Sequence, residues 1–344
     1  LRFSMIMITA QGADVFLEKD TFDIGRNFAN KLWNASRFFL GNIDNKMLFN
    51  ELPTKDKLKT EDLWILSRYN RTIKEVVLSL NNYRLNDVCH LLYDFIWHDF
   101  CDWYIESKKL DLYQDSKGNE RENTLNLCGF LLAGILKLLH PIMPFITEEI
   151  WAHLNQKVEY PLCIDQEMII NSLYPKENSY YIDKDLEKKF NLLQELIITL
   201  RTIRSENNIP PDKRGKVLII PSDKTQANWL SNEIRLINVF AKIHTTIIDV
   251  HAKKPLFAGQ GIVGGIQIFL ELEGLINKDI EIERMKKEIA HLRKIADGAR
   301  KRLTNEKFLK KAPEEVVARE NEKYKNIINN IEKLTKNLYT IQMR

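Results

Sequence analysis

Apolar residues recur in alternating steps of three and four along two stretches near the end of the chain, residues 282–303 and 324–341. This heptad pattern places the apolar residues on one side of each helix, where two helices can pair. Pro313, followed by two glutamates, is a suitable start for the second helix. We therefore expect an antiparallel coiled-coil hairpin over residues 278–344, with a first helix about 35–40 Å long at ~1.5 Å per residue.

The charge of this expected hairpin is lopsided. Residues 278–344 contain 18 Lys and Arg against 11 Asp and Glu, a net charge of +7, whereas the whole chain carries +4. Residues 284–311 contain eleven basic residues and only three acidic ones. A coiled coil with a purely structural role normally balances its outer positions, so the excess favours binding to a nucleic-acid backbone over a merely solvated surface. The candidate contacts are Arg293, Lys294, Arg300, Lys301, Arg302, Lys307, Lys310 and Lys311.

Residues 24–39 form a second patterned stretch. Phe28, Leu32, Ala35 and Phe39 fall on one face of a helix, and the flanks carry amide and cationic side chains but no acid. Asn and Arg suit base edges, Arg and Lys suit phosphates, and aromatic rings can stack on unpaired bases. The same pattern fits a buried helix whose asparagines bond neighbouring helices, so the residues alone leave both interpretations open. The side chains in question are Arg26, Asn27, Asn30, Lys31, Asn34 and Arg37, with Trp33 and Phe38 as the aromatics.

The overall pattern predicts a mainly α-helical chain in three parts. Residues 1–159 should form an all-helical bundle, whose central helix is the aromatic-rich stretch 83–109. Residues 160–277 should form a small α/β domain, and residues 278–344 the coiled-coil hairpin. The expected bundle helices are 24–39, 62–81, 83–109, 125–139 and a short helix starting near Thr147. The expected elements of the α/β domain are helix 185–207, strand 216–220, helix 225–242, and strands 245–250 and 266–272.

A glycine-rich run at residues 259–265 could suggest a phosphate loop. No Gly-Lys-Ser/Thr follows it, and the next segment has a strand pattern, so a hairpin turn is the better interpretation. The chain shows no catalytic constellation and no metal signature, so we expect neither a catalytic site nor a metal site. Its four cysteines are widely spaced, and three lie in apolar helical patterns typical of buried free thiols in a cytoplasmic protein.

No apolar run approaches the roughly 18–20 residues that a membrane span needs, so we expect no membrane association. The start of the chain lacks the charged, apolar and small-residue order of a signal peptide. It also lacks an initiator methionine, which suggests a fragment of a longer protein.

Several stretches, in order along the chain, resemble valyl-tRNA synthetases. The sequence Arg-Asn-Phe-Ala-Asn-Lys-Leu-Trp-Asn-Ala at residues 26–35 resembles the helix that opens their anticodon-binding domain, and residues 93–104 resemble its central helix. Residues 140–151, from His-Pro to Thr-Glu-Glu-Ile-Trp, match a motif shared with the isoleucyl and leucyl enzymes. Residues 305–317 resemble the tip of the C-terminal coiled coil. The cysteine zinc module in which the isoleucyl enzyme typically ends is missing here, so the resemblance is to the valyl branch.

The resemblance implies roles for the two expected surfaces. The bundle would read the valine anticodon, with Phe38 and Ile105 against unstacked bases and with Arg26, Lys31 and Arg37 on phosphates. The coiled coil would lie along the outer corner of the L-shaped tRNA. The full set of implied anticodon contacts is Arg26, Asn30, Lys31, Asn34, Arg37, Phe38 and Ile105.

The resemblance also implies an activity that this chain should not perform alone. The enzymes it resembles join valine to tRNA(Val) through valyl-adenylate, using ATP and Mg²⁺, and hydrolyse misattached threonine. The nucleotide-binding and editing domains are missing here, so the expected role is to position tRNA(Val), without a cofactor and as a monomer that does not bind DNA. Two alternatives are a free-standing tRNA- or ribosome-binding module and a structural coiled-coil protein whose arm binds an acidic partner.

Overall fold

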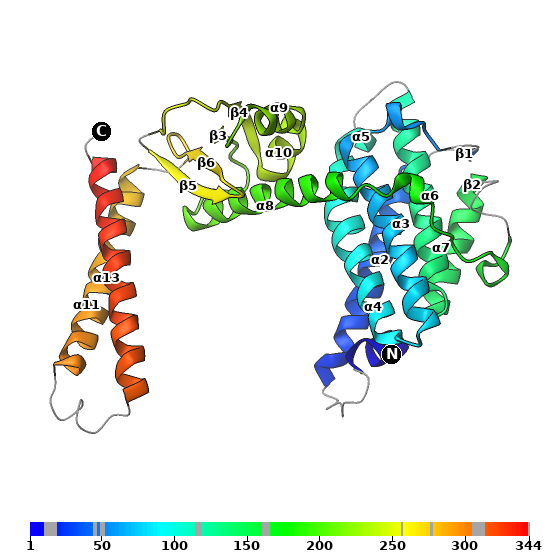
Figure 1. Ribbon diagram of the computed structural model, residues 1–344, viewed down its shortest axis with the longest axis horizontal. Coiled ribbons are helices and arrows are strands. Elements are labelled where there is room, and N and C mark those ends of the chain that lie inside the picture. Colours follow the sequence, from blue (N-terminus) through cyan, green and yellow to red (C-terminus); the bar gives the residue numbers. More distant parts are fainter. Residues whose placement is uncertain are drawn as a thin grey trace. The chain divides into compact units, whose positions relative to one another are not determined.

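A computed structural model describes residues 1–9, 19–43, 47–48, 52–113, 119–159, 166–255, 257–275, 278–304 and 314–342. Contacts divide the chain into two compact units, residues 1–191 and 192–344. The fold class is the predicted one: a helical bundle, a small mixed α/β part and a helical hairpin (Figure 1). The division falls inside helix α8 (Lys184–Glu206), whereas the sequence analysis set a domain border at residue 159.

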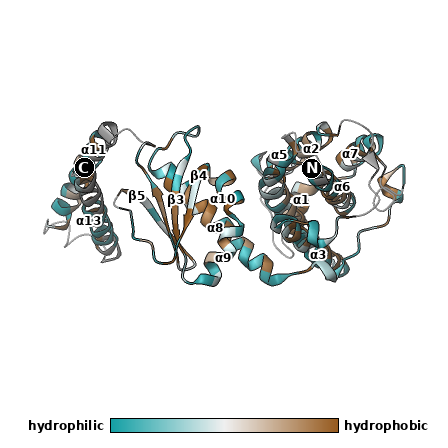
Figure 2. Ribbon diagram, turned by 90° about the horizontal axis from the view of Figure 1, so that it is seen from above, coloured by the Kyte–Doolittle hydropathy of each residue, from teal (hydrophilic) through white to brown (hydrophobic). Residues whose placement is uncertain are grey.

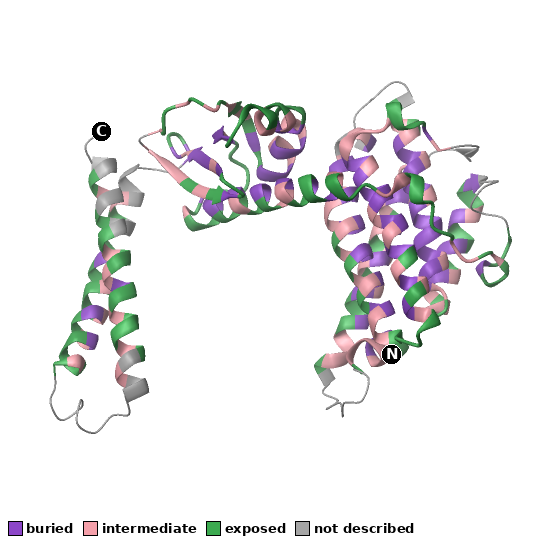
Figure 3. Ribbon diagram, in the orientation of Figure 1, coloured by how far each residue is buried: buried purple, intermediate pink, exposed green. Residues whose placement is uncertain are grey.

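The first unit is a bundle of helices packed side by side. Its main helical segments are α2 (Asp23–Gly41), α3 (Thr60–Asn81), α4 (Leu85–Tyr93), η3 (Asp94–Ile105), α5 (Glu106–Tyr113), α6 (Asn119–Leu139) and α7 (Pro144–Lys157). The shorter elements are α1 (Arg2–Ile8), η1 (Lys19–Phe22), β1 (Met47–Leu48), η2 (Lys55–Lys57), β2 (Val158–Glu159), η4 (Ile169–Asn171) and η5 (Ser179–Tyr181). Hydrophobic sides of these helices face one another (Figure 2), and buried residues concentrate between them (Figure 3).

Helix α2 confirms the predicted amphipathic pattern. Phe28, Leu32 and Phe39 are at most 1% exposed, while Ala35 is only half-buried. The fourth inward position is taken by Ser36, whose hydroxyl donates to the carbonyl of Leu32 at 2.8 Å. A serine is tolerated there because this bond within the helix satisfies its polar group.

The central helix is continuous but not uniformly α-helical. Between α4 and α5, segment η3 is a π-helix of twelve residues, in which backbone hydrogen bonds reach five residues along instead of four. Tyr83, expected at the start of this helix, instead lies in the turn before it, with a positive φ of 56° and a side chain that is 85% exposed.

A fully buried lysine joins α3 to the central helix. The Lys108 ammonium lies 2.9 Å from the Glu61 carboxylate and 2.8 Å from that of Asp62, and the side chain has 0% exposure. Burial by itself lowers the pKa of Lys108, but the charges of Asp62 and Glu61 outweigh it and raise this pKa above its ordinary value. The Tyr104 hydroxyl donates to Asp62 at 2.9 Å. The sequence analysis assigned none of these charges to the core.

The first part of α8 packs on α3 and belongs to the bundle. The carboxylate of Glu187, a buried residue, lies 2.6 Å from the Arg71 guanidinium and accepts a 2.6 Å hydrogen bond from Ser67. Beside this cluster, the rings of Trp64 and Phe190 stack with their centroids 4.0 Å apart. These contacts fix the start of α8 on the bundle, beyond the predicted domain border.

The second unit contains a four-stranded mixed sheet of order β4-β3-β6-β5. Strand β3 pairs in parallel with β4 and antiparallel with β6, which pairs antiparallel with β5. The strands are β3 (Gly215–Ile220), β4 (Ile243–Ile248), β5 (Ala258–Val263) and β6 (Ile266–Glu271). The glycine-rich run forms the predicted hairpin, because Gly264 and Gly265, with φ of 51° and 82°, make the turn that joins β5 to β6.

One expected helix of this unit is broken. The predicted helix 225–242 consists of α9 (Lys224–Asn232) and α10 (Ile234–Ala241). Between them, Glu233 leaves helical geometry, with φ −101° and ψ 7°, and its amide bonds the carbonyl of Leu230, only three residues back.

The heptad stretches form the predicted antiparallel hairpin of two helices, α11 (Lys278–Leu303) and α13 (Glu314–Gln342), which lie side by side (Figure 1). The 26 residues of α11 correspond to about 39 Å at ~1.5 Å per residue. Its seam contains Ile289, Ala296, Ala299 and Ile327, each below 10% exposure. Few other described residues of the hairpin are buried (Figure 3), so its surface is large for its core.

One stretch corrects the statement that no apolar run approaches the length of a membrane span. Residues 120–139 of α6 are long and apolar enough, by length and composition, to cross a membrane. However, 72% of this stretch is buried inside the structure, as befits a core helix of the bundle. The predicted buried thiols are confirmed for Cys89, Cys101 and Cys128, and burial raises the pKa of each to about 12. Cys163 lies outside the described residues.

The Lys108 cluster makes a prediction about stability. Lys108→Met keeps the volume but leaves two buried carboxylates without their cation, so we expect the free energy of unfolding to fall by roughly 3–5 kcal/mol at neutral pH. The loss should shrink as the pH falls, because protonation removes the unpaired negative charge. Urea denaturation at two pH values measures both effects. Lys109→Met, at the neighbouring and partly exposed position, is the control, and equal stability of the two variants would contradict the prediction.

Candidate nucleic-acid interface

Most of the polar residues predicted on α2 lie on its solvent side. Arg26, Asn30, Asn34 and Arg37 are exposed, and they share one side of the helix because their spacing follows its turn. Of these four, only Arg26 pairs with an acid within the described residues: Asp23 lies 3.1 Å away, and both side chains are largely exposed. The helix therefore presents amide and guanidinium groups in a suitable arrangement for phosphates and base edges.

Lys31, which the resemblance assigned to a phosphate, is paired with an acid of the bundle. Its ammonium forms an ion pair with Asp102 of η3 and lies 4.8 Å from the centroid of the Trp97 ring. His98 lies 3.4 Å from the other oxygen of the same carboxylate. The ion pair with Asp102 holds α2 against η3, and the phosphate contact of Lys31 stays a prediction.

Phe38 and Ile105, which the resemblance assigned to unstacked bases, differ in exposure. Phe38 is half-buried, so part of its ring faces solvent, whereas Ile105 is only 4% exposed. The ammonium of Lys109, on α5, lies 5.7 Å from the Phe38 ring centroid and 2.6 Å from the Glu106 carboxylate. Lys109 could not be singled out from the sequence, since nothing in a Lys-Lys pair shows which lysine is buried.

The eight predicted contacts of the hairpin fall into three groups. Arg293, Lys294, Arg300 and Lys301 are exposed and form no ion pair with any described residue. Arg302 instead bridges to Glu320 of α13 at 3.2 Å, which assigns it a part in joining the two helices. The remaining predicted contacts, Lys307, Lys310 and Lys311, lie outside the described residues.

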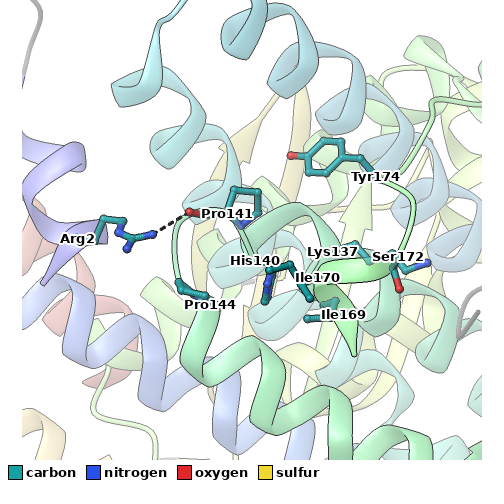
Figure 4. A pocket seen from close by; sticks show the side chains of 9 residues that line it. All are labelled: Arg2, Lys137, His140, Pro141, Pro144, Ile169, Ile170, Ser172 and Tyr174. Atoms are coloured by element: carbon teal, nitrogen blue, oxygen red, sulfur yellow. Dashed lines mark hydrogen bonds between the residues drawn. The ribbon is translucent and has the colours of Figure 1, made fainter. Parts of the chain in front are cut away.

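The motif at residues 140–151 lines a depression of about 380 Å³ between α1, the α6–α7 turn and η4 (Figure 4). Arg2 donates to the carbonyl of Pro141 at 3.1 Å across one side of it. The Thr147 hydroxyl lies 2.9 Å from the carbonyl of Met143 and forms a 2.8 Å hydrogen bond with the His140 imidazole Nδ1. Burial lowers the pKa of His140 and favours its neutral form. These contacts give the motif a structural role in shaping the α6–α7 turn.

Two protein-family models match the chain. The anticodon-binding domain of tRNA ligases matches residues 62–219, and the tRNA-binding arm of valyl-tRNA synthetases matches residues 278–342, the extent of the helical hairpin. The first match begins in α3, so α2 with its exposed polar residues precedes it. The anticodon contacts named from the resemblance therefore stay a prediction.

Similar proteins align with nearly the whole of this chain. The chain is 34% identical to the valine–tRNA ligase of Fusobacterium nucleatum over 344 residues, which is 99% of this chain and 38% of that protein. It is 37% identical to that of Bacillus subtilis over 95% of this chain and 36% of the relative. It is 36% identical to the valine–tRNA ligase of Thermotoga maritima over 94% of this chain and 35% of that protein.

The bundle and the basic hairpin thus place the chain among the tRNA ligases, in the region of their anticodon-binding domain and tRNA-binding arm. More particularly, the chain belongs to the valine–tRNA ligase family, as the recognised resemblance indicated. It spans little more than a third of the length of the curated relatives it matches.

The two ion pairs of α2 yield a prediction that separates structural from surface charges. In a double-mutant cycle of Lys31→Met and Asp102→Asn, we expect a coupling energy of about 0.5–1 kcal/mol in the free energy of unfolding, because this pair is partly shielded from solvent. The pair Arg26–Asp23 on the same helix is more exposed and should show a smaller coupling. Urea unfolding of the four variants in each cycle measures both, and a larger coupling for Arg26–Asp23 would refute the structural role of Lys31.

Proposed function

We propose that this chain binds tRNA(Val) with two surfaces that act on different parts of the RNA. The exposed side of α2, with Phe38 at its edge, contacts the anticodon, and the basic residues of α11 contact the backbone at the tRNA elbow. The longer protein would join valine to this tRNA using ATP and Mg²⁺ and remove misattached threonine. We also propose a monomer that acts in the cytoplasm.

The observation that supports this most is the distribution of charge along the hairpin. Four cations of α11, at positions 293, 294, 300 and 301, are exposed and form no ion pair with the described residues. Helix α13 carries five basic and five acidic residues between 314 and 342, so it is neutral overall. A helix with excess positive charge, paired with a neutral helix, is suited to bind a polyanion, whose counterions are released on binding. A structural coiled-coil protein does not account for this together with the anticodon-domain match. The free-standing module is not favoured, because the similar proteins are longer valine–tRNA ligases.

Division of labour between the surfaces follows from chemistry. Phosphate contacts supply affinity without reading sequence, while base contacts discriminate. The arm should therefore bind different tRNAs alike, and α2 should prefer one anticodon. In the longer relatives, ATP and Mg²⁺ would serve the joining of valine, and we assign no residue described here to them.

One prediction of this proposal concerns the stacking role of Phe38. Phe38→Ala should weaken binding of tRNA(Val) roughly 5- to 150-fold, because stacking of one base on an aromatic ring is worth about 1–3 kcal/mol. It should also remove the preference for tRNA(Val) over a tRNA with a different anticodon. Equilibrium binding of both RNAs by filter retention measures this. Phe145→Ala, which removes an 88% exposed ring from α7, is the matched control and should leave the preference unchanged.

Another prediction of this proposal concerns the basic residues of α11. The double charge reversal Arg300→Glu and Lys301→Glu should weaken all tRNAs alike and reduce the dependence of log K on log salt by about 1–2 units, as expected for two lost phosphate contacts. Lys323→Glu with Lys325→Glu makes the same change in net charge on α13. If both pairs weaken binding equally, net charge alone acts and the contact surface on α11 is wrong.

A further inference from the structure

The exposed side of α2 has aromatic residues at both of its edges. At about 100° per residue, Phe38 lies about 100° around the helix from Arg37 in one direction, and Trp33 lies about 40° in the other. Phe38 faces α5, where the Lys109 ammonium lies 5.7 Å from its ring centroid. Trp33 faces α7, where its ring lies 6.0 Å from the ring of His153 at an interplanar angle of 69°.

A pocket of about 340 Å³ opens beside Trp33, between α2 and α7. Its α2 side is formed by Trp33, Arg37 and Leu40, and its α7 side by Ile150, His153 and Lys157. Trp33 is half-buried and held against His153, so one wall is aromatic. Leu40 and Ile150 add aliphatic surface. A flat ring system of the size of a nucleobase finds apolar walls here that suit its faces.

The rim of the pocket is cationic. The Lys157 ammonium donates to the carbonyls of Leu40 at 3.2 Å and Ile43 at 2.9 Å, at the end of α2, which fixes its position. Arg37 is exposed and forms no ion pair within the described residues. Glu149 is the acid nearby, 3.4 Å from the His153 imidazole. Apolar walls with a positive rim favour an aromatic ligand that carries negative charge, which is the chemistry of a nucleotide.

We propose that the α2–α7 pocket takes a second unpaired base of the bound RNA. The inference rests on the proposed function and extends it. One base stacks on Phe38, another enters the pocket beside Trp33 and His153, and Arg37 holds the phosphate that links them. The RNA strand then crosses α2 from its α5 side to its α7 side, and the asparagines between the two aromatics face the strand.

Fluorine NMR tests this directly. The full chain is labelled with 5-fluorotryptophan, the Trp33 signal is assigned with Trp33→Phe, and an anticodon stem-loop RNA of tRNA(Val) is added. We expect the Trp33 resonance to shift on binding, while the resonances of Trp64, which is fully buried in the bundle, and Trp229, which lies in the second unit, stay in place. A Trp33 signal that does not move when the RNA is bound would overturn the proposal.

Two variants measure the contribution of the pocket to affinity. Trp33→Leu should weaken stem-loop binding roughly 5- to 150-fold, the range for one stacked base. His153→Ala, which removes the ring against Trp33, should also weaken it. His90→Ala, at an exposed position of α4, is the control and should bind as the unchanged chain does. His153→Ala keeps the test valid if Trp33→Leu does not fold, because His153 is exposed.

The outcomes separate the two proposals. If the unchanged chain binds neither the stem-loop nor whole tRNA(Val), the proposed function fails and the pocket proposal fails with it. If the unchanged chain binds and Phe38→Ala weakens binding, but both pocket variants bind normally, only the second base site is overturned.

Discussion

The architecture of the bundle depends on one buried charge. Lys108 lies between the carboxylates of Glu61 and Asp62, and removing the lysine would leave two negative charges without compensation in a low-dielectric interior. Because the ammonium must point at α3, the rotation of α5 about its own axis is fixed. The next residue, Lys109, is thereby turned toward the surface, where its ammonium lies over the Phe38 ring. A buried ion cluster thus sets the surroundings of the proposed base-stacking residue.

The two surfaces differ in the support behind them. The bundle holds α2 on a large core, with Phe28, Leu32 and Phe39 fully buried, so the orientation of its outward side chains is defined. The hairpin has a narrow seam, and its cations extend on long flexible side chains from a helix that is mostly exposed (Figure 3). Defined orientation is what reading of base edges requires, and a flexible array of charges is sufficient for attraction to phosphates.

Much of the fold could be predicted from the sequence because apolar spacing follows burial. The amphipathic helix α2, the hairpin of α11 and α13 and the β5–β6 turn were all indicated by spacing or by glycine position. Pairings between distant side chains could not be predicted: neither the burial of Lys108 nor the ion pair of Lys31 has a local signature. The break at Glu233 lies within a continuous helical pattern, and no proline or glycine marks it. For the candidate sites, the sequence indicated the residue types. It did not indicate which of the basic side chains form ion pairs with acids.

The π-helical segment of the central helix has a consequence for how its sequence is read. One row of buried residues along this helix recurs at every fourth position, and in an α-helix each such step would advance about 40° beyond a full turn. Over six steps the row would drift by about 240° and leave the core. The wider turns of η3 counteract this drift, so that a strict four-residue period stays on one face. Deleting one residue from η3 would rotate the residues that follow it about the helix axis. The later buried positions of the row would then no longer face the core. The row consists of Val88, Leu92, Ile96, Phe100, Tyr104, Lys108 and Leu112, each at most 3% exposed.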